Sequence, residues 1–330
     1  MPKAEVDAPQ PESRFVIGTR GSRLALWQAN HVADRLNDAG LRGVDIEVLS
    51  TKGDRVLDVP LAEIGDKGLF TAELDAALLD GRLDLAVHSL KDLPTTLPDG
   101  LVLAAVTARE DPSDAFVAHP DYVGRLGQLP YGATLATSSL RRRAQLLAWR
   151  PDLRIVSVRG NVPTRVGKLD ASGALASPPS VSGWHGAILA SAGLVRLELA
   201  DRIRDRIPPS VMIPAVGQGA LGIVCRANAP HTRRQLADAL QDASARAACD
   251  AERALLRQLE GGCQVPVAAN ARVTGADLVL DASVVSLDGR EAVRDRIEGP
   301  AAEAVALGER LAARLVEAGA SAILDAIRAA

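Results

Sequence analysis

The sequence is poor in aromatic residues and in cysteine. Phe, Trp and Tyr together account for 2% of its 330 residues, too few for the stacking platforms on which proteins hold single-stranded nucleic acid. The chain has three cysteines and no Cys-x-x-Cys pair, which fits a reducing compartment better than a disulfide framework. We therefore expect neither a nucleic-acid partner nor a disulfide-stabilised scaffold.

Long apolar runs are also missing. No uncharged apolar stretch is long enough to span a membrane, and the opening MPKAEVDAPQPES has no apolar signal-peptide core. The net charge of −3 lacks the polycationic character that drives nonspecific DNA binding. These features predict a cytoplasmic protein that binds neither membrane nor nucleic acid.

Several catalytic motifs are absent. No GxGxxG follows a predicted strand and GxxxxGK[ST] does not occur, which argues against a nucleotide site. The five histidines are dispersed, without HExxH or a Cys/His pairing, so we predict no metal. GxSxG is missing as well, and no serine hydrolase triad can be nominated.

What is present is the composition of a folded protein with a sheet and helices in alternation. The chain is 47% hydrophobic and 24% charged, and its length suggests two or three domains. From Phe15 the pattern runs strand, turn, helix, with Ser22 as the N-cap and Gly40 past the helix end. VDIEVLS, ELDAALLDG and LDLAVHSL continue the alternation as strand, helix and strand. This predicts an α/β fold with a largely parallel sheet.

The second half repeats that layout and then changes. The run EDPSDAF around Pro112 indicates a crossing between lobes, after which two strand–helix units follow. A Ser/Pro/Gly-rich stretch, 171–186, is typical of a surface loop. From Ala243 a long amphipathic helix runs to Leu259, and two strands then flank the turn Asp288-Gly289 before the last helices. This end of the chain predicts a small α+β domain.

Basic residues gather between 141 and 168. Eight cations stand there against the single acid Asp152, a local +7 in a chain of net −3; they are Arg141, Arg142, Arg143, Arg150, Arg154, Arg159, Arg165 and Lys168. A solvated basic helix face is the plain interpretation. The first turn of a helix disfavours cations, however, and Arg141 and Arg142 fall in that turn, so an anionic ligand is the simpler explanation.

Other arginines are placed like ligands of an anion. Arg159 and Arg165 flank the loop RGNVPTR, and Arg20 leads another strand–helix turn beside Ser22. Guanidinium groups match carboxylates through paired hydrogen bonds. The sequence therefore predicts a cleft for a polyanion, either a polycarboxylate or a phosphate.

VHSLKDLP ends a strand with three polar side chains at the edge where open α/β sheets bind ligands: Ser89, Lys91 and Asp92. Lys91 and Asp92 could form a simple loop ion pair. Alternatively, Asp92 is an acid/base that stabilises developing positive charge, and Lys91 holds a substrate carboxylate. The dipeptide alone does not separate the two interpretations.

The cysteines differ in their surroundings. Cys225 lies in an apolar strand and Cys249 on a helix, so both are most simply buried packing residues. Cys263 lies in the glycine loop of LEGGCQVP, and glycine permits the close approach that a thiol in a cleft needs. From the sequence alone, a structural and a chemical role for Cys263 are equally supported.

Six motifs occur in one order along the chain: GTRGSRLALWQA, VHSLKDLPT, TSSLRRRAQLL, VRGNVPTRVGKL, PAVGQGALGIVCR and AERALLRQLEGGCQVP. On these motifs the chain resembles the porphobilinogen deaminase (hydroxymethylbilane synthase) family, from about Phe15 to the last helix. The resemblance implies a transferase of tetrapyrrole (haem) biosynthesis. It would join four porphobilinogen molecules head to tail with loss of ammonia and release linear hydroxymethylbilane by hydrolysis.

The resemblance also implies a cofactor and a fold. The family's dipyrromethane cofactor is held by a thioether on the cysteine of EGGCQ, which is Cys263 in this sequence. The fold has two α/β lobes like those of periplasmic binding proteins and a small C-terminal α+β domain, and the family is monomeric. We expect a disordered tail over 1–11, a first lobe over 12–107 and 215–238, a second over 108–214, and the third domain over 239–330.

Individual positions carry over from the family motifs. Asp92 matches the catalytic aspartate, while Lys67 and Phe70 match a lid segment near the active site. The candidate positions for binding cofactor and substrate carboxylates are Arg20, Ser22, Ser89, Lys91, Ser139, Arg141, Arg142, Arg159, Arg165 and Arg196.

The sequence departs from the family pattern in places, and a rival class exists. Glu63 stands where some relatives have lysine, His185 stands where aspartate is frequent, and the 171–186 loop is long. The rival is a two-lobed carboxylate-binding or sensor protein without catalysis. Against it stand Asp92 and Cys263, because binding alone requires neither a proton donor nor a covalent anchor.

Overall fold

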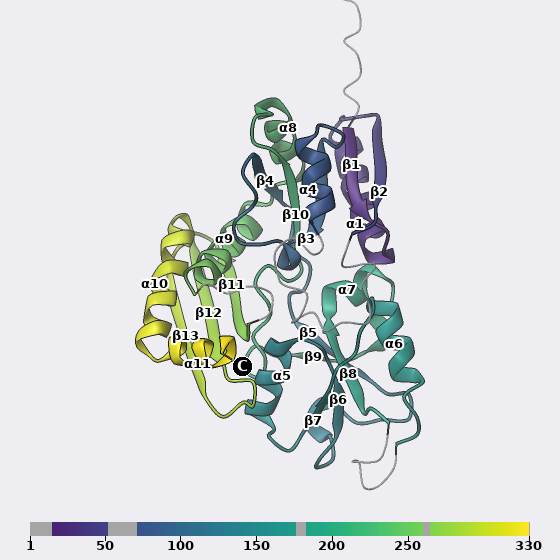
Figure 1. The fold of residues 1–330 in the computed structure, drawn as a ribbon, viewed down its shortest axis with the longest axis vertical. Coiled ribbons are helices and arrows are strands. Elements are labelled where there is room, and N and C mark those ends of the chain that lie inside the picture. The colour runs from purple at the N-terminus through teal and green to yellow at the C-terminus, as the bar shows by residue number, and fades with distance from the viewer. Residues whose placement is uncertain (1–14, 52–70, 176–182, 260–264, 330) are drawn as a thin grey trace, which may run out of the picture.

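The structure, a computed structural model, describes residues 15–51, 71–175, 183–259 and 265–329 (Figure 1). Four residues considered above lie outside the described residues: Glu63, Lys67, Phe70 and Cys263. Within the described ranges, no helix has the length and apolarity needed to cross a membrane.

The first lobe is a five-stranded sheet covered by helices on both faces. Its strands, in the order β2-β1-β3-β10-β4, are Val44–Leu49, Phe15–Arg20, Leu85–Ser89, Leu221–Arg226 and Leu101–Val106. One face packs against α1 (Arg23–Asp38) and α8 (Pro230–Leu240), and the other against α4 (Ala72–Leu79). The alternating side chains of the strands supply both cores.

The second lobe repeats this design. Its strands, in the order β7-β6-β8-β5-β9, are Arg154–Val156, Thr134–Ala136, Gly186–Ala190, Asp114–Ala118 and Ile203–Ile207. Helix α5 (Leu140–Trp149) packs on one face through Leu146, while α6 (Val162–Asp170) and α7 (Ser191–Arg196) cover the other.

The two sheets have the same topology. In each, four strands run parallel and one runs antiparallel to both of its neighbours, namely β10 in the first lobe and β5 in the second. Each antiparallel strand is the one the chain enters directly after it crosses between the lobes. The predicted crossing near Pro112 is therefore confirmed, and the predicted parallel sheet is correct apart from one strand per lobe.

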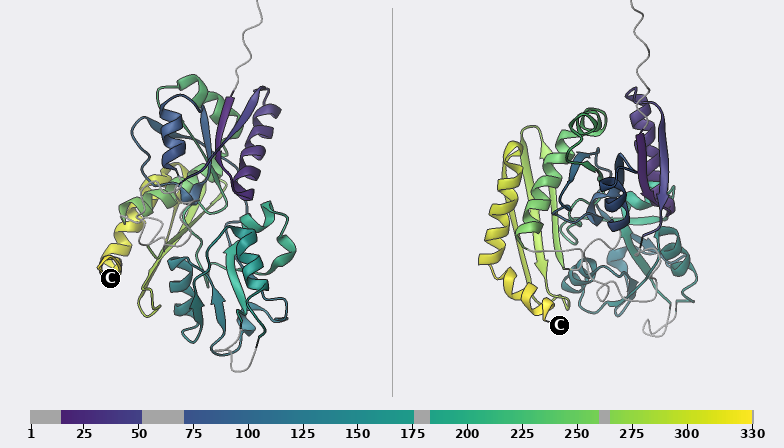
Figure 2. Two further views of the ribbon diagram at one scale, coloured as in Figure 1. Left: turned by 45° about the vertical axis from the view of Figure 1, so that its right-hand side comes forward. Right: turned by 45° about the horizontal axis from the view of Figure 1, so that its top comes forward.

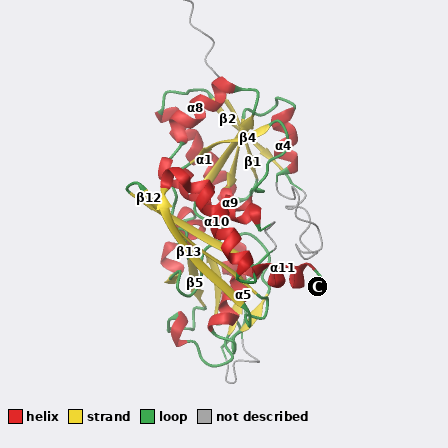
Figure 3. Cartoon of the chain, turned by 90° about the vertical axis from the view of Figure 1, so that its left-hand side faces the viewer, coloured by secondary structure: helices red, strands yellow, loops and turns green. Residues whose placement is uncertain are grey.

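The C-terminal part is a three-stranded antiparallel sheet with helices on one face. Strands β11 (Val267–Thr274), β12 (Asp277–Val285) and β13 (Ala292–Pro300) follow α9 (Ala243–Gln258), and α10 (Ala304–Glu317) and α11 (Ala320–Arg328) end the chain. Leu255 of α9 and Leu311 of α10 belong to one buried cluster with Leu280. Figure 3 shows α9 and α10 lying across this sheet. The predicted α+β domain and its Asp288-Gly289 turn are confirmed, with Gly289 at a φ of 77°.

The three parts meet at the two crossings, and Figure 2 shows the C-terminal sheet beside both lobes. Glu252 of α9 is fully buried, and its carboxylate accepts hydrogen bonds from Arg109 at 2.6 and 3.2 Å. It also accepts from the backbone N–H groups of Gly217 and Ala271, each at 2.7 Å. One carboxylate thus joins both crossings to α9 and β11.

Candidate functional site

The candidate residues gather at the carboxyl ends of parallel strands from both lobes. This is the edge where α/β sheets bind ligands, because the loops that follow the strands converge there. Strands β1 and β3 present the first-lobe residues, and β6, β7 and β8 present those of the second lobe. In chain order these are Arg20, Ser22, Ser89, Lys91, Asp92, Ser139, Arg141, Arg142, Arg159, Arg165 and Arg196.

Two of the serines begin helices. Ser22 caps α1, its Oγ accepting a hydrogen bond from the Ala25 N–H at 3.2 Å, and Ser139 caps α5, its Oγ accepting from the Arg142 N–H at 3.4 Å. The cap at Ser22 was predicted from the sequence. Capping fixes these hydroxyl groups at helix N-termini, where backbone N–H groups favour an anion.

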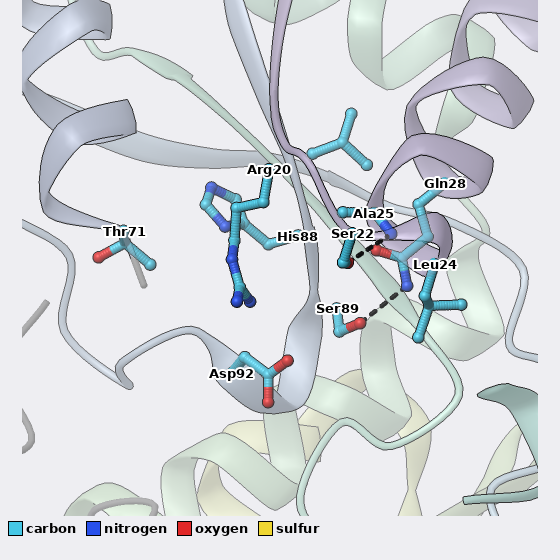
Figure 4. Close-up of a pocket in the computed structure, with 10 residues that line it drawn as sticks. Arg20, Ser22, Leu24, Ala25, Gln28, Thr71, His88, Ser89 and Asp92 are labelled. Atoms are coloured by element: carbon cyan, nitrogen blue, oxygen red, sulfur yellow. Dashed lines mark hydrogen bonds between the residues drawn. The ribbon is translucent and has the colours of Figure 1, made fainter. Parts of the chain in front are cut away.

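Four of the first-lobe candidates line a pocket, namely Arg20, Ser22, Ser89 and Asp92. Asp92 ends the short helix η1 (Leu90–Asp92), and Figure 4 shows its carboxylate below the Arg20 guanidinium, which is directed toward it. Gln28, itself buried, donates a hydrogen bond to Ser89 Oγ at 2.8 Å. The Asp92 side chain is exposed, and among the described residues no hydrogen bond restrains it.

His88 lines the same pocket (Figure 4) and was not singled out from the sequence. Burial lowers the pKa of His88 to about 4, and the charge of Arg20 acts in the same direction. Its Nε2 is buried without a hydrogen-bond partner in the described part of the chain. His88 is therefore neutral at physiological pH and adds no charge to the pocket.

Lys91 lies between the lobes. Its Nζ donates a hydrogen bond to Gln218 Oε1 at 3.4 Å. Burial lowers the pKa of Lys91 to about 8, against the opposing attraction of Asp92. The guanidinium groups of Arg142 and Arg141 act in the same direction as burial, and Asp114 opposes them. The position of Lys91 thus holds an ammonium group less favourably than water does.

The sequence predicted an anionic ligand for Arg141 and Arg142, and that prediction is wrong for their main partner. The anion that balances them is a protein carboxylate, because Asp114 of β5 pairs with Arg141 Nη1 at 2.7 Å and with Arg142 Nη2 at 2.7 Å. All three side chains are buried. Burial alone would raise the pKa of the Asp114 carboxyl, but the two guanidinium groups outweigh burial and hold the pKa well below its usual range.

Gln218 connects the two half-sites. It is 1% exposed and lies on the second crossing between Gly217 and Gly219, whose φ values are 70° and 93°. Its Nε2 donates hydrogen bonds to Asp114 Oδ1 at 3.0 Å and to the Pro112 carbonyl at 2.7 Å, while its Oε1 accepts from Lys91. One amide thus links Lys91 to the carboxylate that holds the buried arginines.

Arg165 differs from the buried pair. Its Nε donates to the Gly160 carbonyl at 2.7 Å, and no carboxylate of the described residues forms an ion pair with it. Burial lowers the pKa of Arg165 to about 10, together with repulsion from Arg142 and Arg159. Attraction from Asp92 opposes that shift. The side chains of the two lobes are therefore within electrostatic reach of one another.

Arg196 packs against the first lobe. Its Nη2 donates to the Gly219 carbonyl at 2.6 Å, and its guanidinium lies 5.5 Å from the centre of the Trp27 ring. Burial lowers the pKa of Arg196. These contacts join α7 to α1 and to the second crossing, close to the cleft.

The described cysteines are buried and unpaired. Burial raises the pKa of Cys225, and burial together with Glu252 raises the pKa of Cys249 to about 12. Since the thiolate is the reactive form, neither thiol is suited to covalent chemistry. Cys263, Lys67 and Phe70 lie outside the described residues, and within those residues no cluster of His, Cys, Asp or Glu is suited to a metal ion.

Three supporting residues were missed from the sequence. Asp114 carried a signal, since it opens the apolar strand DAFVA, and an acid buried there requires a cation. Gln218 carried a weaker one, a polar side chain between two glycines in the quoted motif PAVGQGAL. Gln28 carried none, because a glutamine on a helix is ordinarily a surface residue.

Comparison with known families agrees with this geometry. Residues 15–234 match the family model of porphobilinogen deaminase, dipyromethane cofactor binding domain. Residues 246–317 match that of porphobilinogen deaminase, C-terminal domain. The cofactor of the matched family is thus a dipyrromethane.

Curated relatives carry the same name over nearly the whole chain. Porphobilinogen deaminase of Desulforudis audaxviator is 53% identical over 315 residues, covering 95% of this chain and 98% of the relative. That of Synechococcus elongatus is 50% identical over 319 residues, covering 96% of each. Among solved structures, the methionine binding protein MetQ is 13% identical, with a TM-score of 0.39 over 68% of this chain and 89% of its own. The chain belongs to the porphobilinogen deaminase family and is a transferase of tetrapyrrole biosynthesis with hydroxymethylbilane synthase activity.

Proposed function

We propose that the cleft divides the reaction between its two sides, with Asp92 handling protons while cations from both lobes hold the carboxylates of cofactor and substrate. The observation that carries this proposal is electrostatic. Asp92 of the first lobe acts on Lys91 beside it and on Arg165 of the second lobe. An exposed carboxylate surrounded by cations suits a group that must exchange protons and also face developing positive charge.

The cationic groups fit a dipyrromethane, whose two pyrrole rings carry acetate and propionate side chains. Arg165 has no carboxylate partner among the described residues, and the pKa values of Arg165 and Lys91 are lowered by burial. Carboxylates placed in the cleft would relieve both penalties. When bound, the cofactor supplies the covalent primer to which pyrrole units are added.

Asp92 is proposed to act on the substrate twice. Loss of ammonia from porphobilinogen requires a proton on the departing amine and leaves positive charge on the pyrrole ring, which a nearby carboxylate stabilises. After the new carbon–carbon bond forms, a proton must leave the ring carbon that reacted, and a carboxylate can accept it. The Arg20 guanidinium above Asp92 (Figure 4) is placed to hold a substrate carboxylate near this carboxyl group.

Cys263 is proposed as the attachment point of the cofactor. The chain has three cysteines, and two of them are buried thiols whose pKa values are raised. A thioether requires a thiolate that can reach the cofactor. These facts support Cys263, which also stands at the cysteine of the family motif.

Replacing Asp92 with Asn tests the proposal. We expect kcat to fall by about 10²–10⁴-fold, the usual contribution of a positioned acid/base, while the protein stays folded. Asp99→Asn is the matched control, an exposed acid that follows shortly after Asp92 in the chain. Ammonia release and hydroxymethylbilane formation are measured with porphobilinogen as substrate. Equal turnover in the two variants would remove Asp92 from the mechanism.

Two further statements remain predictions from the sequence, namely that the enzyme is monomeric and that it works in the cytoplasm. The alternative of a two-lobed binding or sensor protein without catalysis has no observation in its favour, since the curated relatives are enzymes.

A further inference from the structure

A second hollow lies outside the catalytic cleft, where the first lobe meets the C-terminal domain. We call it the arginine groove; its floor is Leu101–Ala104 of β4 and its walls come from α8 and α9. In Figure 1, β4 lies between these two helices. The groove has a volume of about 740 Å³, which is within the range of small-molecule sites. Its charged lining residues are Arg233, Arg234, Arg246, Asp250, Arg253 and Arg257.

The charge of the groove is unbalanced. Five guanidinium groups face one carboxylate, a net of +4 in a chain whose total is −3. The Asp250 carboxylate already forms an ion pair with Arg246, whose Nε lies 2.8 Å from Asp250 Oδ2. Arg233, Arg234 and Arg257 are exposed and form no ion pair within the described ranges. Burial and the charge of Arg257 lower the pKa of Arg253. Cations above an apolar floor match an organic anion that has several carboxylates and an apolar body.

One wall of the groove reaches the catalytic loop. Arg253 is 5% exposed, and its guanidinium donates hydrogen bonds to the carbonyls of Leu93 at 3.4 Å, Pro94 at 2.7 Å and Thr95 at 3.2 Å. These residues follow Asp92 directly in the chain. A carboxylate in the groove would compete with the three carbonyls for Arg253, and the segment that carries Asp92 would lose its restraint.

We propose that the arginine groove binds a small organic polycarboxylate with an apolar body, and that this binding lowers turnover through Arg253. The proposal rests on the established reaction, because the tetrapyrroles made from porphobilinogen carry several carboxylates on an apolar body. The apolar floor beneath the guanidinium groups favours such a molecule over an acidic protein segment, which would supply carboxylates without the apolar body.

The test uses the cofactor-loaded enzyme and uroporphyrin I, an octacarboxylate porphyrin, as the probe. We expect uroporphyrin to lower kcat without raising KM for porphobilinogen. In Arg233→Glu/Arg234→Glu this inhibition should be at least tenfold weaker, while turnover without the probe is unchanged. The matched control is Arg42→Glu/Arg290→Glu, which makes the same charge change at exposed positions outside the groove and should be inhibited like the parent. Citrate, which lacks an apolar body, should not inhibit.

Progress curves distinguish two sources of the ligand. Curvature without added probe, absent from the groove variant, would identify the enzyme's own product. Linear curves together with uroporphyrin inhibition would identify a later tetrapyrrole.

Two outcomes overturn the proposal. Purely competitive inhibition, equal in the parent and both double variants, would place the probe in the catalytic cleft alone. Inhibition by an octaglutamate peptide through Arg233 and Arg234, without any by uroporphyrin, would assign the groove to an acidic protein segment. Neither outcome touches the role of Asp92, because the groove variant keeps its basal turnover.

Discussion

The two lobes share one strand order but bring different side chains to the same cleft. At its strand ends the first lobe presents an exposed carboxylate, Asp92, beside Lys91. The second lobe presents arginines, and it has a buried carboxylate of its own, Asp114, to hold two of them. The shared topology therefore determines where the site lies, whereas the loops at the strand ends determine its chemistry. We assign proton transfer to the first lobe and carboxylate binding mainly to the second.

The largest expected effect comes from breaking the buried pair in the second lobe. Replacing Asp114 with Ala leaves two buried guanidinium groups uncompensated, which should cost about 3–5 kcal/mol of the free energy of unfolding. Urea unfolding measures it. Asp170→Ala, which removes the partially exposed Arg202–Asp170 pair of the same lobe, should cost at most about 1 kcal/mol.

If Asp114→Ala does not fold, Asp114→Asn keeps the shape and removes only the charge. Equal stability losses at positions 114 and 170 would contradict the claim that Asp114 is the structural anion of this lobe.

The next largest effect is expected at Arg165, which, unlike Arg141 and Arg142, has no carboxylate partner among the described residues. In Arg165→Gln, kcat/KM for porphobilinogen should fall about 10- to 100-fold, because a hydrogen bond to a charged group contributes about 1.5–3 kcal/mol. The free energy of unfolding should not fall, since burial already disfavours this charge. Arg42→Gln, an exposed arginine after α1, is the control. A loss of stability with unchanged kinetics would make Arg165 a structural residue.

A smaller effect is expected from the link between the lobes. Gln218→Ala removes the amide that joins Lys91 to Asp114, and one hydrogen bond is worth about 1 kcal/mol, or about fivefold in kcat/KM. Gln235→Ala, on the partly exposed side of α8, should have no effect. If the two variants behave alike, the two half-sites do not depend on Gln218.

The smallest effect is a shift in one titration. Lys91 should titrate near pH 8 in protein without cofactor, and carboxylates in the loaded cleft should raise its pKa. Lys91 should therefore be largely neutral above pH 8 in protein without cofactor, and its deprotonation should move to higher pH in the loaded protein. Carbon NMR of reductively methylated protein resolves this, because the chain has only five lysines and Lys91→Arg assigns the signal. If Lys91 titrates near 10.5, the ordinary lysine value, in protein without cofactor, the claim that burial disfavours its charge is wrong.

Much of this arrangement could be predicted from sequence, because local signals carry it. Ser22 indicated the start of a helix, and the strand-end positions of an α/β fold converge by geometry. The sequence did not predict contacts between residues that lie far apart in the chain. The partner of Arg141 and Arg142 lies on β5, and no local pattern shows that β5 enters the sheet antiparallel beside β8.

The arginine groove escaped prediction for the same reason. Arg233 and Arg253 lie on different helices, α8 and α9, and only the packing of both helices around β4 brings them together. Their separate positions in the sequence are typical of ordinary solvent-exposed helix charges. Side chains that meet through tertiary packing leave no periodic signal in the chain.

The most direct test of the account is the intact mass of the purified protein beside that of Cys263→Ser, with Cys249→Ser as the matched control. The account predicts an excess mass of two pyrrole units in the parent and in Cys249→Ser, and the bare sequence mass in Cys263→Ser. The same excess in Cys263→Ser, or its loss in Cys249→Ser alone, would contradict the assignment of the cofactor to Cys263.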